Sequence, residues 1–255
     1  MNRMDVNCLI GRWPFRSLGK HTMQDLLKVH ADNGITGGCV ASLNSIFYND
    51  PVEGEEELHE ALEGLTGYSH IITVNPMLSA AISDIRKCLR MFPVKGVRIY
   101  PGYHNYSLSD PRVSALCDEL ENQKLPLFLP LRMEDERSDY LMMPRVLPMD
   151  ELKAFVTGHP NLTIILLNIR TYELTDCCEV LKSSPNLLFD TSGFSYDQFN
   201  VENYTAEFGP EKIVYGSLFP LYCMKSTILQ VEKADVTPQV QQLIFFDNIK
   251  AVLKE

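Results

Sequence analysis

The stretch TIILLNIRTYELTDCCEVLKSSPNLLFDTSG, residues 163–193, decides the fold of this chain. It begins with an apolar run at 163–169 and ends with a second one at 187–193. Residues 173–182, between the two runs, favour a helix. A strand, a helix and a second strand in this order form a βαβ unit, and such units build a parallel sheet.

The same alternation runs along the whole chain. Strands are predicted at eight places, namely residues 4–10, 36–43, 70–76, 96–101, 125–131, 163–169, 187–193 and 213–220. Helices are predicted from residue 23 to near 34, and at 55–65, 78–91, 111–123, 148–158, 173–182, 197–208, 225–232 and 238–254. Eight such units in 255 residues favour a closed (β/α)8 barrel over an open doubly wound sheet. The sequence also lacks the glycine-rich phosphate-binding motifs of open sheets. We therefore expect one α/β domain, a (β/α)8 barrel over residues 1–255.

The composition restricts the partners of the chain. Its net charge of −10 argues against a nucleic-acid partner, which needs a clustered positive surface. No run approaches the roughly 18 apolar residues of a membrane span, and the N-terminal apolar run is too short for a signal peptide. We therefore expect a cytoplasmic protein without a membrane partner. The seven cysteines include no CxxC pair and are predicted to be free thiols.

Six segments, in the right order, carry a resemblance to a known family. They are DVNCLIG (5–11), KGVRIYPGYH (95–104), DPRVSALCDELENQKLPLFLP (110–130), HPNLTIILLNIR (159–170), NLLFDTSG (186–193) and GPEKIVYGSLFP (209–220). Together they resemble the successive blocks of the amidohydrolase-related metal-dependent hydrolases, a TIM-barrel family that also includes decarboxylases. The resemblance implies a site at the C-terminal ends of the strands.

The resemblance also implies where metal ligands would stand. The family carries His-x-His at the end of strand 1, a histidine at the ends of strands 5 and 6, and an Asp in a Gly-Ser-Asp-x-Pro block at strand 8. Position by position, this chain has Asn7, Leu9, Pro130, Asn168 and Leu218 instead. Hydrocarbon and neutral amide groups are poor ligands for Zn²⁺ and similar ions. We therefore expect no metal at these positions, and we predict no cofactor.

Few acid–base groups are expected at the same end of the barrel. Asp190 follows strand 7, and His104 is the one histidine predicted on this side, so these two are the candidate catalytic residues if the chain has activity. A plainer role for Asp190 is hydrogen bonding to the backbone and Thr191. A metal cluster of Cys8, His104 and Asp190 is a further alternative. Trp13 is predicted either as a pocket wall or as a packed residue of a surface loop.

Arginines are the other feature of this end. Several of them close together in a partly dry cleft call for an anion, and their fork geometry suits carboxylate or phosphate. The candidate ligand-binding residues are Asn7, Arg12, Arg98, Tyr100, Arg132, Asn168, Arg170 and Ser217. In the alternative interpretation, the arginines pair with local acids, namely Asp190, Glu134, Asp135 and Glu136.

Three functions are compatible with these residues. The first is a protein that has lost the metal chemistry and binds a small anionic molecule at the barrel mouth. The second is a metal-independent hydrolase or decarboxylase that uses Asp190, His104 and the arginines. The third is a non-catalytic barrel that serves protein association, for example as a homodimer.

Overall fold

The computed structural model describes residues 2–135, 144–194 and 198–254. Its eight strands run parallel, each paired with the next in sequence order. They are β1 Met4–Ile10, β2 Gly37–Ser42, β3 Tyr68–Thr73, β4 Val94–Arg98, β5 Leu127–Pro130, β6 Ile164–Leu167, β7 Leu187–Asp190 and β8 Ile213–Val214. Two backbone hydrogen bonds of 2.9 Å, from Val6 N to Tyr215 O and from Leu9 N to Phe219 O, join the first strand to the segment around the last. The predicted (β/α)8 barrel is confirmed.

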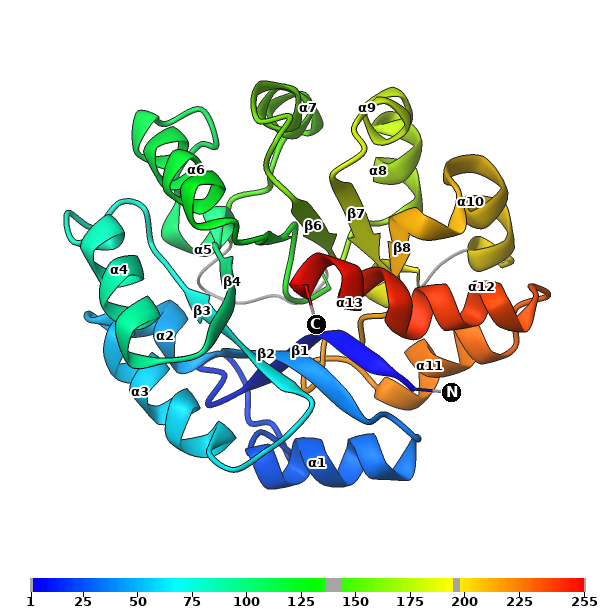
Figure 1. Ribbon diagram of the computed structural model, residues 1–255, viewed down its shortest axis with the longest axis horizontal. Helices are drawn as coiled ribbons and strands as arrows, with labels where there is room; N and C mark the ends of the chain where they lie inside the picture. The colour runs from blue at the N-terminus through cyan, green and yellow to red at the C-terminus, as the bar shows by residue number, and fades with distance from the viewer. Residues whose placement is uncertain (1, 136–143, 195–197, 255) are drawn as a thin grey trace.

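Helices surround the strands on the outside of the barrel (Figure 1). The longer ones are α1 Met23–Asp32, α3 Pro51–Leu62, α4 Ala81–Met91, α6 Pro111–Gln123, α7 Met149–Gly158, α8 Thr171–Asp176, α9 Cys178–Ser183, α10 Asn200–Phe208 and α11 Met224–Glu232. The short α2 Asn44–Phe47 and α5 Pro101–His104 follow β2 and β4, and the chain ends with α12 Pro238–Gln242, the π-helical turn Leu243–Asp247 and α13 Asn248–Leu253. The helix predicted at 173–182 is divided into α8 and α9 at Cys177, and the start of the one predicted at 197–208 lies outside the described residues.

Aspartates begin two of the helices. Asp50 accepts a hydrogen bond from Val52 N at 3.0 Å and precedes α3, and Asp110 accepts one from Arg112 N at 2.9 Å and precedes α6. Each is followed by a proline at the first helical position, where the missing N–H is not needed. The predicted helix start at Asp110 is confirmed, and the acidic run from residue 52 lies within α3.

The last predicted strand is much shorter than the sequence indicates. Residues 213–220 are all apolar or small, yet only Ile213 and Val214 belong to β8. Leu218 has a φ of +55°, which no strand residue adopts, and Ser217 N donates to the side chain of Asp5 instead of to a strand. The strand predicted at 187–193 likewise ends at Asp190, whose carboxylate accepts from Ser192 N and begins a 3₁₀ turn at Thr191–Gly193.

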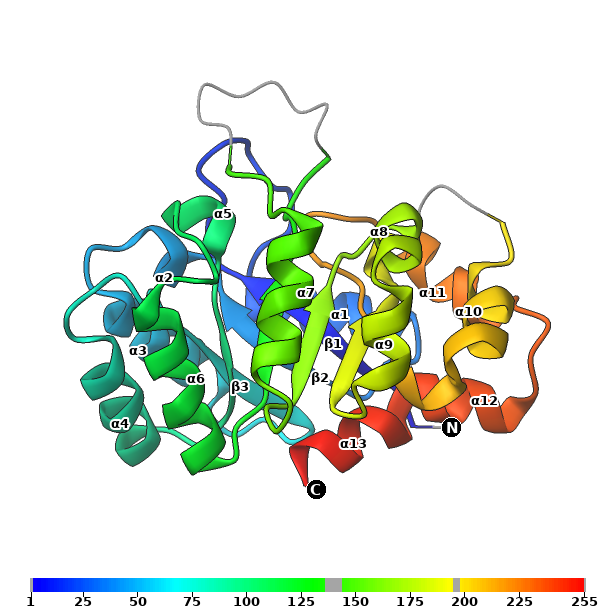
Figure 2. The ribbon, with the colours of Figure 1, turned by 90° about the horizontal axis from the view of Figure 1, so that it is seen from above.

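The apolar core forms two layers. One lies between the strands and the helices, and the other fills the inside of the barrel, as the alternation of side chains along each strand requires. Helix α13 covers the end at which the strands begin, and α2 and α5 lie at the opposite end (Figure 2). Among the described residues, no helix has the length and apolar character needed to cross a membrane.

Candidate functional site

The centre of the C-terminal end of the barrel is apolar. Leu9 and Leu218 are completely buried and belong to the interior apolar cluster, together with Trp13, Phe128 and Met133. Two of the five positions that the resemblance assigns to metal ligands are thus packed hydrocarbon. At these two positions the interior of the barrel is therefore packed hydrocarbon without side-chain donor atoms.

The backbone at Leu218 is unusual for a leucine. Its φ of +55° lies in the left-handed region, which costs an ordinary residue about 1–2 kcal/mol and which Asn, Asp and Gly adopt more readily. Complete burial of a leucine side chain contributes about 1.5–3 kcal/mol and offsets this cost. The backbone of this turn therefore suits an aspartate, but the residue present is a leucine, and apolar packing holds its side chain.

Asp190 is a buried carboxylate that connects several strands. It is fully buried, and its Oδ2 accepts a hydrogen bond from Asn7 Nδ2 at 2.8 Å, while its Oδ1 accepts one from Asn168 N at 2.7 Å. Ser192 Oγ lies 2.8 and 2.9 Å from the two oxygens. A Cβ on Gly216 would lie 2.2 Å from Oδ2, so this position requires glycine. Asp190 thus joins β1, β6 and the turn after β7.

The burial of Asp190 changes its acidity. Loss of water raises its pKa to about 6, although the hydrogen bonds from Asn168, Asn7 and Ser192 and the charge of Arg98 oppose the rise. A carboxyl group with this pKa exchanges its proton near neutral pH. A hydrogen bond between Asp190 and Thr191 was expected, but the hydrogen bonds of Asp190 in the described residues do not include this side chain. Thr191 Oγ1 instead accepts a hydrogen bond from Gly216 N at 3.2 Å.

Asn168 stands at the end of β6 with a φ of +55°. Its Nδ2 lies 3.2 Å from Arg132 O and 3.4 Å from the Tyr222 hydroxyl, and donates to these oxygens. Its backbone N–H binds Asp190, as described above. Both amide groups of Asn168 therefore position neighbouring segments of the mouth.

The four candidate arginines have different surroundings. Arg132 forms a two-pronged ion pair with Glu173 and donates to Asn168 O at 2.7 Å, so its charge is compensated. Arg170 begins α8, and its backbone N–H donates to the same Glu173 at 2.8 Å. Arg12 is exposed, and its backbone N–H donates to Asn44 at 2.8 Å.

The acids that the sequence offered as partners for the arginines did not include Glu173. That residue lies in α8, which begins directly after β6, and it is buried where Arg132 reaches it. Glu134 instead accepts hydrogen bonds from Trp13 Nε1 at 2.9 Å and from Arg16 Nε at 2.6 Å. Glu136 lies outside the described residues.

Arg98 is the arginine that lies inside the barrel. It is 1 % exposed, its Cζ lies 5.3 Å from the centre of the Tyr100 ring, and its Nη2 lies 3.7 Å from Met133 Sδ. Within the described part of the chain, Arg98 Nε and the Tyr100 hydroxyl make no hydrogen bond. Burial raises the pKa of Tyr100 to about 12, so its hydroxyl stays protonated. The predicted shared face of Arg98 and Tyr100 is confirmed.

His104 lies at the edge of the mouth, in α5. Its Nε2 is 2.9 Å from Ile46 O and donates to it, and burial lowers its pKa. The structure does not bring His104 together with Cys8 and Asp190. In the described ranges, one group of three potential metal ligands lies close together, and in it Cys8 is accompanied by Asp5 and His30.

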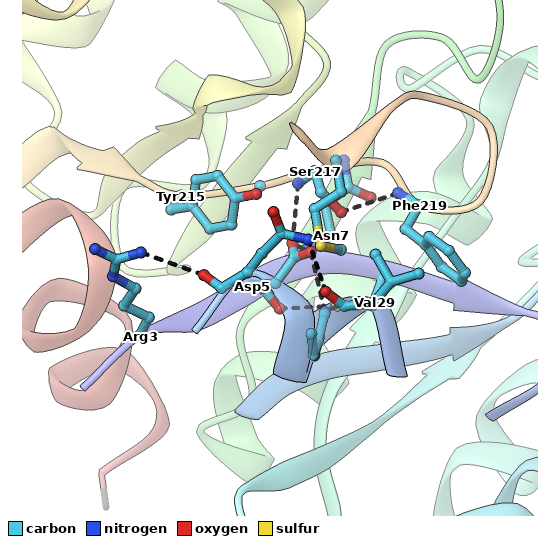
Figure 3. A network of polar contacts seen from close by, with 12 residues as sticks. Arg3, Asp5, Asn7, Val29, Tyr215, Ser217 and Phe219 are labelled. Carbon is cyan, nitrogen blue, oxygen red and sulfur yellow. Dashed lines mark hydrogen bonds and ion pairs between the residues drawn. The ribbon is translucent and has the colours of Figure 1, made fainter. Parts of the chain in front are cut away.

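Ser217 serves the backbone of the loop after β8. Its N–H donates to Asp5 Oδ1 at 2.9 Å, and its Oγ accepts a hydrogen bond from Phe219 N at 3.0 Å (Figure 3). These contacts fix the turn that carries Leu218. Ser217 is completely buried.

An aromatic cluster next to the mouth is the feature that the sequence did not reveal. Trp13 makes edge contacts with Phe15, Phe47 and Tyr103, with ring centres 5.2, 5.6 and 5.5 Å away. It is 5% exposed, lies in the loop between β1 and α1 and packs in the same apolar cluster as Leu9, so of its two predicted roles the packed loop residue is the better description. The rings come from three segments that are distant in sequence, and only the fold brings them together.

Comparisons with known proteins agree with this architecture. The family model described as amidohydrolase matches residues 70–254. No curated protein matches the sequence. A TIM-barrel protein of unknown function from Bordetella bronchiseptica has a TM-score of 0.78 at 13% identity, over 100% of this chain and 99% of that one. The 2,6-dihydroxybenzoate decarboxylase from Rhizobium has a TM-score of 0.73 at 14% identity, over 99% and 98% of the two chains. The 5-carboxyvanillate decarboxylase from Sphingomonas paucimobilis has a TM-score of 0.73 at 12% identity, over 99% of each chain.

These likenesses extend over both chains in full, and the family model covers most of the sequence. At such low identities, the solved structures share the fold. The family match, the eight-stranded barrel and the ordered sequence blocks lead to one conclusion: this chain belongs to the amidohydrolase family.

Proposed function

We propose that this protein binds a small carboxylate or phosphate anion at the C-terminal end of its barrel, where its relatives would bind a metal ion. The observation that carries the proposal is Arg98, which is 1 % exposed and has no carboxylate at ion-pair distance among the described residues. A guanidinium remains charged under all conditions in which proteins fold. A buried guanidinium without a carboxylate at ion-pair distance costs several kcal/mol. The more distant charge of Asp190 recovers part of this free energy, and an anion in direct contact recovers more.

The neighbours of Arg98 suit an anion. The Tyr100 hydroxyl and Arg98 Nε are buried donors without a hydrogen bond in the described ranges. A guanidinium beside a phenol hydroxyl offers several N–H and O–H groups and matches a carboxylate or phosphate. Arg132, in contrast, is already neutralised by Glu173, so it supports the mouth and adds little charge to the ligand.

The residues at the inferred ligand positions do not fit a metal ion. Leu9, Pro130 and Leu218 have no side-chain donor atoms, and Asn7 uses its amide N–H to hold Asp190. Asp190 alone would remain as a carboxylate ligand, whereas a catalytic zinc site needs about three good ligands. The chemistry of these donors therefore supports loss of the metal site.

The experiment measures the melting temperature with inorganic phosphate, benzoate and 2,6-dihydroxybenzoate, the last because it is the compound named for a structurally similar decarboxylase. A ligand that binds only the native state raises the melting temperature according to its concentration. We expect at least one probe to do so with the native protein and with Arg112→Met, an exposed arginine of α6, but not with Arg98→Met. An equal rise in all three proteins contradicts a site at Arg98.

A second function is favoured by the acidity of Asp190. With a pKa of about 6, this buried carboxyl could donate a proton to the ring carbon of an aromatic acid as the bond to its carboxylate breaks and CO₂ leaves. His104 could assist only if its ring turned away from Ile46 O, which it now binds. Release of CO₂ from 2,6-dihydroxybenzoate that disappears in Asp190→Asn would establish this activity, and no release from the native protein would exclude that substrate.

A further inference from the structure

A bulge in β1 turns two side chains toward the same side of the sheet. Opposite β2, Asp5 pairs with Gly38 but Cys8 pairs with Val40, so three steps along β1 correspond to two along β2. In a regular strand, residues three apart face opposite sides. The extra residue of the bulge reverses this relation, and Asp5 and Cys8 both face His30 of α1. All three side chains are buried.

The three potential ligand atoms surround a point. His30 Nε2 lies 3.5 Å from Asp5 Oδ2 and 3.7 Å from Cys8 Sγ, and all three atoms lie within 4.8 Å of one another. The separation of 3.5 Å is long for a hydrogen bond between nitrogen and oxygen, whereas 3.7 Å is an ordinary contact between nitrogen and sulfur. Cys8 Sγ also lies 3.2 Å from Asp5 O and donates to it. In a tetrahedral zinc site with bonds of about 2.3 Å to sulfur and about 2.0–2.1 Å to nitrogen and oxygen, neighbouring ligand atoms are about 3.3–3.6 Å apart. The two separations from His30 Nε2 are therefore close to those around a bound ion, and the third, between Asp5 and Cys8, is at most 4.8 Å.

Hydrogen bonds to the other atoms of Asp5 and His30 orient these two side chains toward the space between the three ligand atoms. Asp5 Oδ1 accepts hydrogen bonds from Asn7 N at 3.0 Å and Ser217 N at 2.9 Å (Figure 3). Its Oδ2 makes no hydrogen bond in the described part of the chain, although it is fully buried. His30 Nδ1 lies 3.0 Å from the Tyr68 hydroxyl. A proton on Nδ1 that donates to Tyr68 leaves the lone pair of Nε2 directed at Asp5 and Cys8, as in known metal-binding histidines.

Gly38 of β2 leaves room for the sulfur. A Cβ at this position would lie 2.8 Å from Cys8 Sγ and 3.4 Å from the His30 ring. Any larger residue would push the thiol away from the other two ligands. The space around the cluster thus depends on the glycine in β2.

We propose that Asp5, Cys8 and His30 bind one divalent cation of the Zn²⁺ class, at a site separate from the barrel mouth. Thiolate, imidazole and carboxylate are the three ligand types that zinc prefers, and they leave a fourth position for a water molecule. On binding, the Cys8 thiol releases its proton to solvent and a sulfur–metal bond forms. The ion would connect α1 to β1.

The experiment loads the site during folding, because its three ligands are inaccessible in the folded protein. The full chain is unfolded in urea with a chelator and refolded with Zn²⁺ or Co²⁺, and the retained metal is measured by elemental analysis after desalting. We expect one equivalent of Zn²⁺, and with Co²⁺ the absorption band of a thiolate–cobalt bond. Near-ultraviolet circular dichroism of each variant confirms that it has folded.

Three variants decide the location. Cys8→Ser should lower retained metal at least tenfold, whereas Cys223→Ser, which changes an exposed cysteine, and Asp190→Asn, which changes the carboxylate of the mouth, should retain it. Tyr68→Phe should fold and weaken binding about 10–100-fold, because His30 loses its orienting partner. The proposal is overturned if the native chain retains no metal, if Cys8→Ser retains as much as the native chain, or if Cys223→Ser loses it. It is also overturned if Asp190→Asn loses the metal, because the metal would then be bound in the mouth.

Discussion

Replacement of Arg98 by methionine should stabilise the protein. The native side chain is almost fully buried and lacks a carboxylate at ion-pair distance among the described residues, so it incurs a desolvation cost of several kcal/mol. The contact of its guanidinium with the Tyr100 ring, at 5.3 Å, returns about 2 kcal/mol. Methionine has a similar length, packs against Met133 and carries no charge. We therefore expect the free energy of unfolding to rise by about 1–3 kcal/mol.

Arg132→Met provides the matched control, with the opposite sign. Arg132 is paired with buried Glu173, and its removal leaves an uncompensated carboxylate inside the protein. Breaking such a pair typically costs about 3–5 kcal/mol. Urea unfolding at pH 7, followed by circular dichroism, measures both variants. If Arg98→Met lowered the free energy of unfolding by as much as Arg132→Met, Arg98 would have to be compensated within the protein, and the argument for an anionic ligand would fail.

Three further predictions concern the mouth. As the pH rises from about 3 to about 7, the native chain should lose about 3 kcal/mol of unfolding free energy, because folded Asp190, with a pKa of about 6, holds its proton more tightly than the unfolded chain does. Urea unfolding at a series of pH values should show this loss in the native chain. The same loss in Asp190→Asn would show that it does not arise from Asp190. Leu218→Asp places a carboxylate in an apolar cluster and should lower the free energy of unfolding by about 3–5 kcal/mol. This variant should not retain added Zn²⁺ at the mouth. Stabilisation of the variant by zinc bound there would refute the account. Trp13→Ala should lower the free energy of unfolding by about 3 kcal/mol, because three aromatic rings lose their packing partner. Glu134→Gln, which changes the hydrogen-bond partner of Trp13, should lower it by less than about 1 kcal/mol. Equal decreases in the melting temperatures of the two variants would contradict this prediction.

The barrel could be predicted because its signal is local and repeated. Each strand is a short apolar run and each following helix has its own period, so eight repeats constrain the fold even where one boundary is wrong. The helix start at Asp110 and the common face of Arg98 and Tyr100 follow from equally local rules. The last strand was overestimated because an apolar sequence does not reveal the positive φ of Leu218.

The site could be predicted only in part. The sequence places Asn7, Asp190 and Asn168 at strand ends, but their mutual hydrogen bonds connect residues up to 183 positions apart. Arg132 finds Glu173, 41 residues away, instead of an acid nearby in sequence. The cluster of Asp5, Cys8 and His30 depends on one bulge in β1, and regular strand alternation would separate Asp5 from Cys8. Contacts that depend on register and tertiary packing have no signal in a single sequence.

The central claim is that the barrel mouth has exchanged a metal site for an anion site at Arg98. The most direct measurement is a crystal structure of the protein grown with ZnCl₂ and benzoate, with an anomalous difference map recorded at the zinc edge. We expect density for a carboxylate against the Arg98 guanidinium and no anomalous peak between Asn7 and Asp190; a zinc peak beside Cys8 and His30 is compatible with this result. A zinc ion coordinated by Asp190 in the mouth would contradict the account.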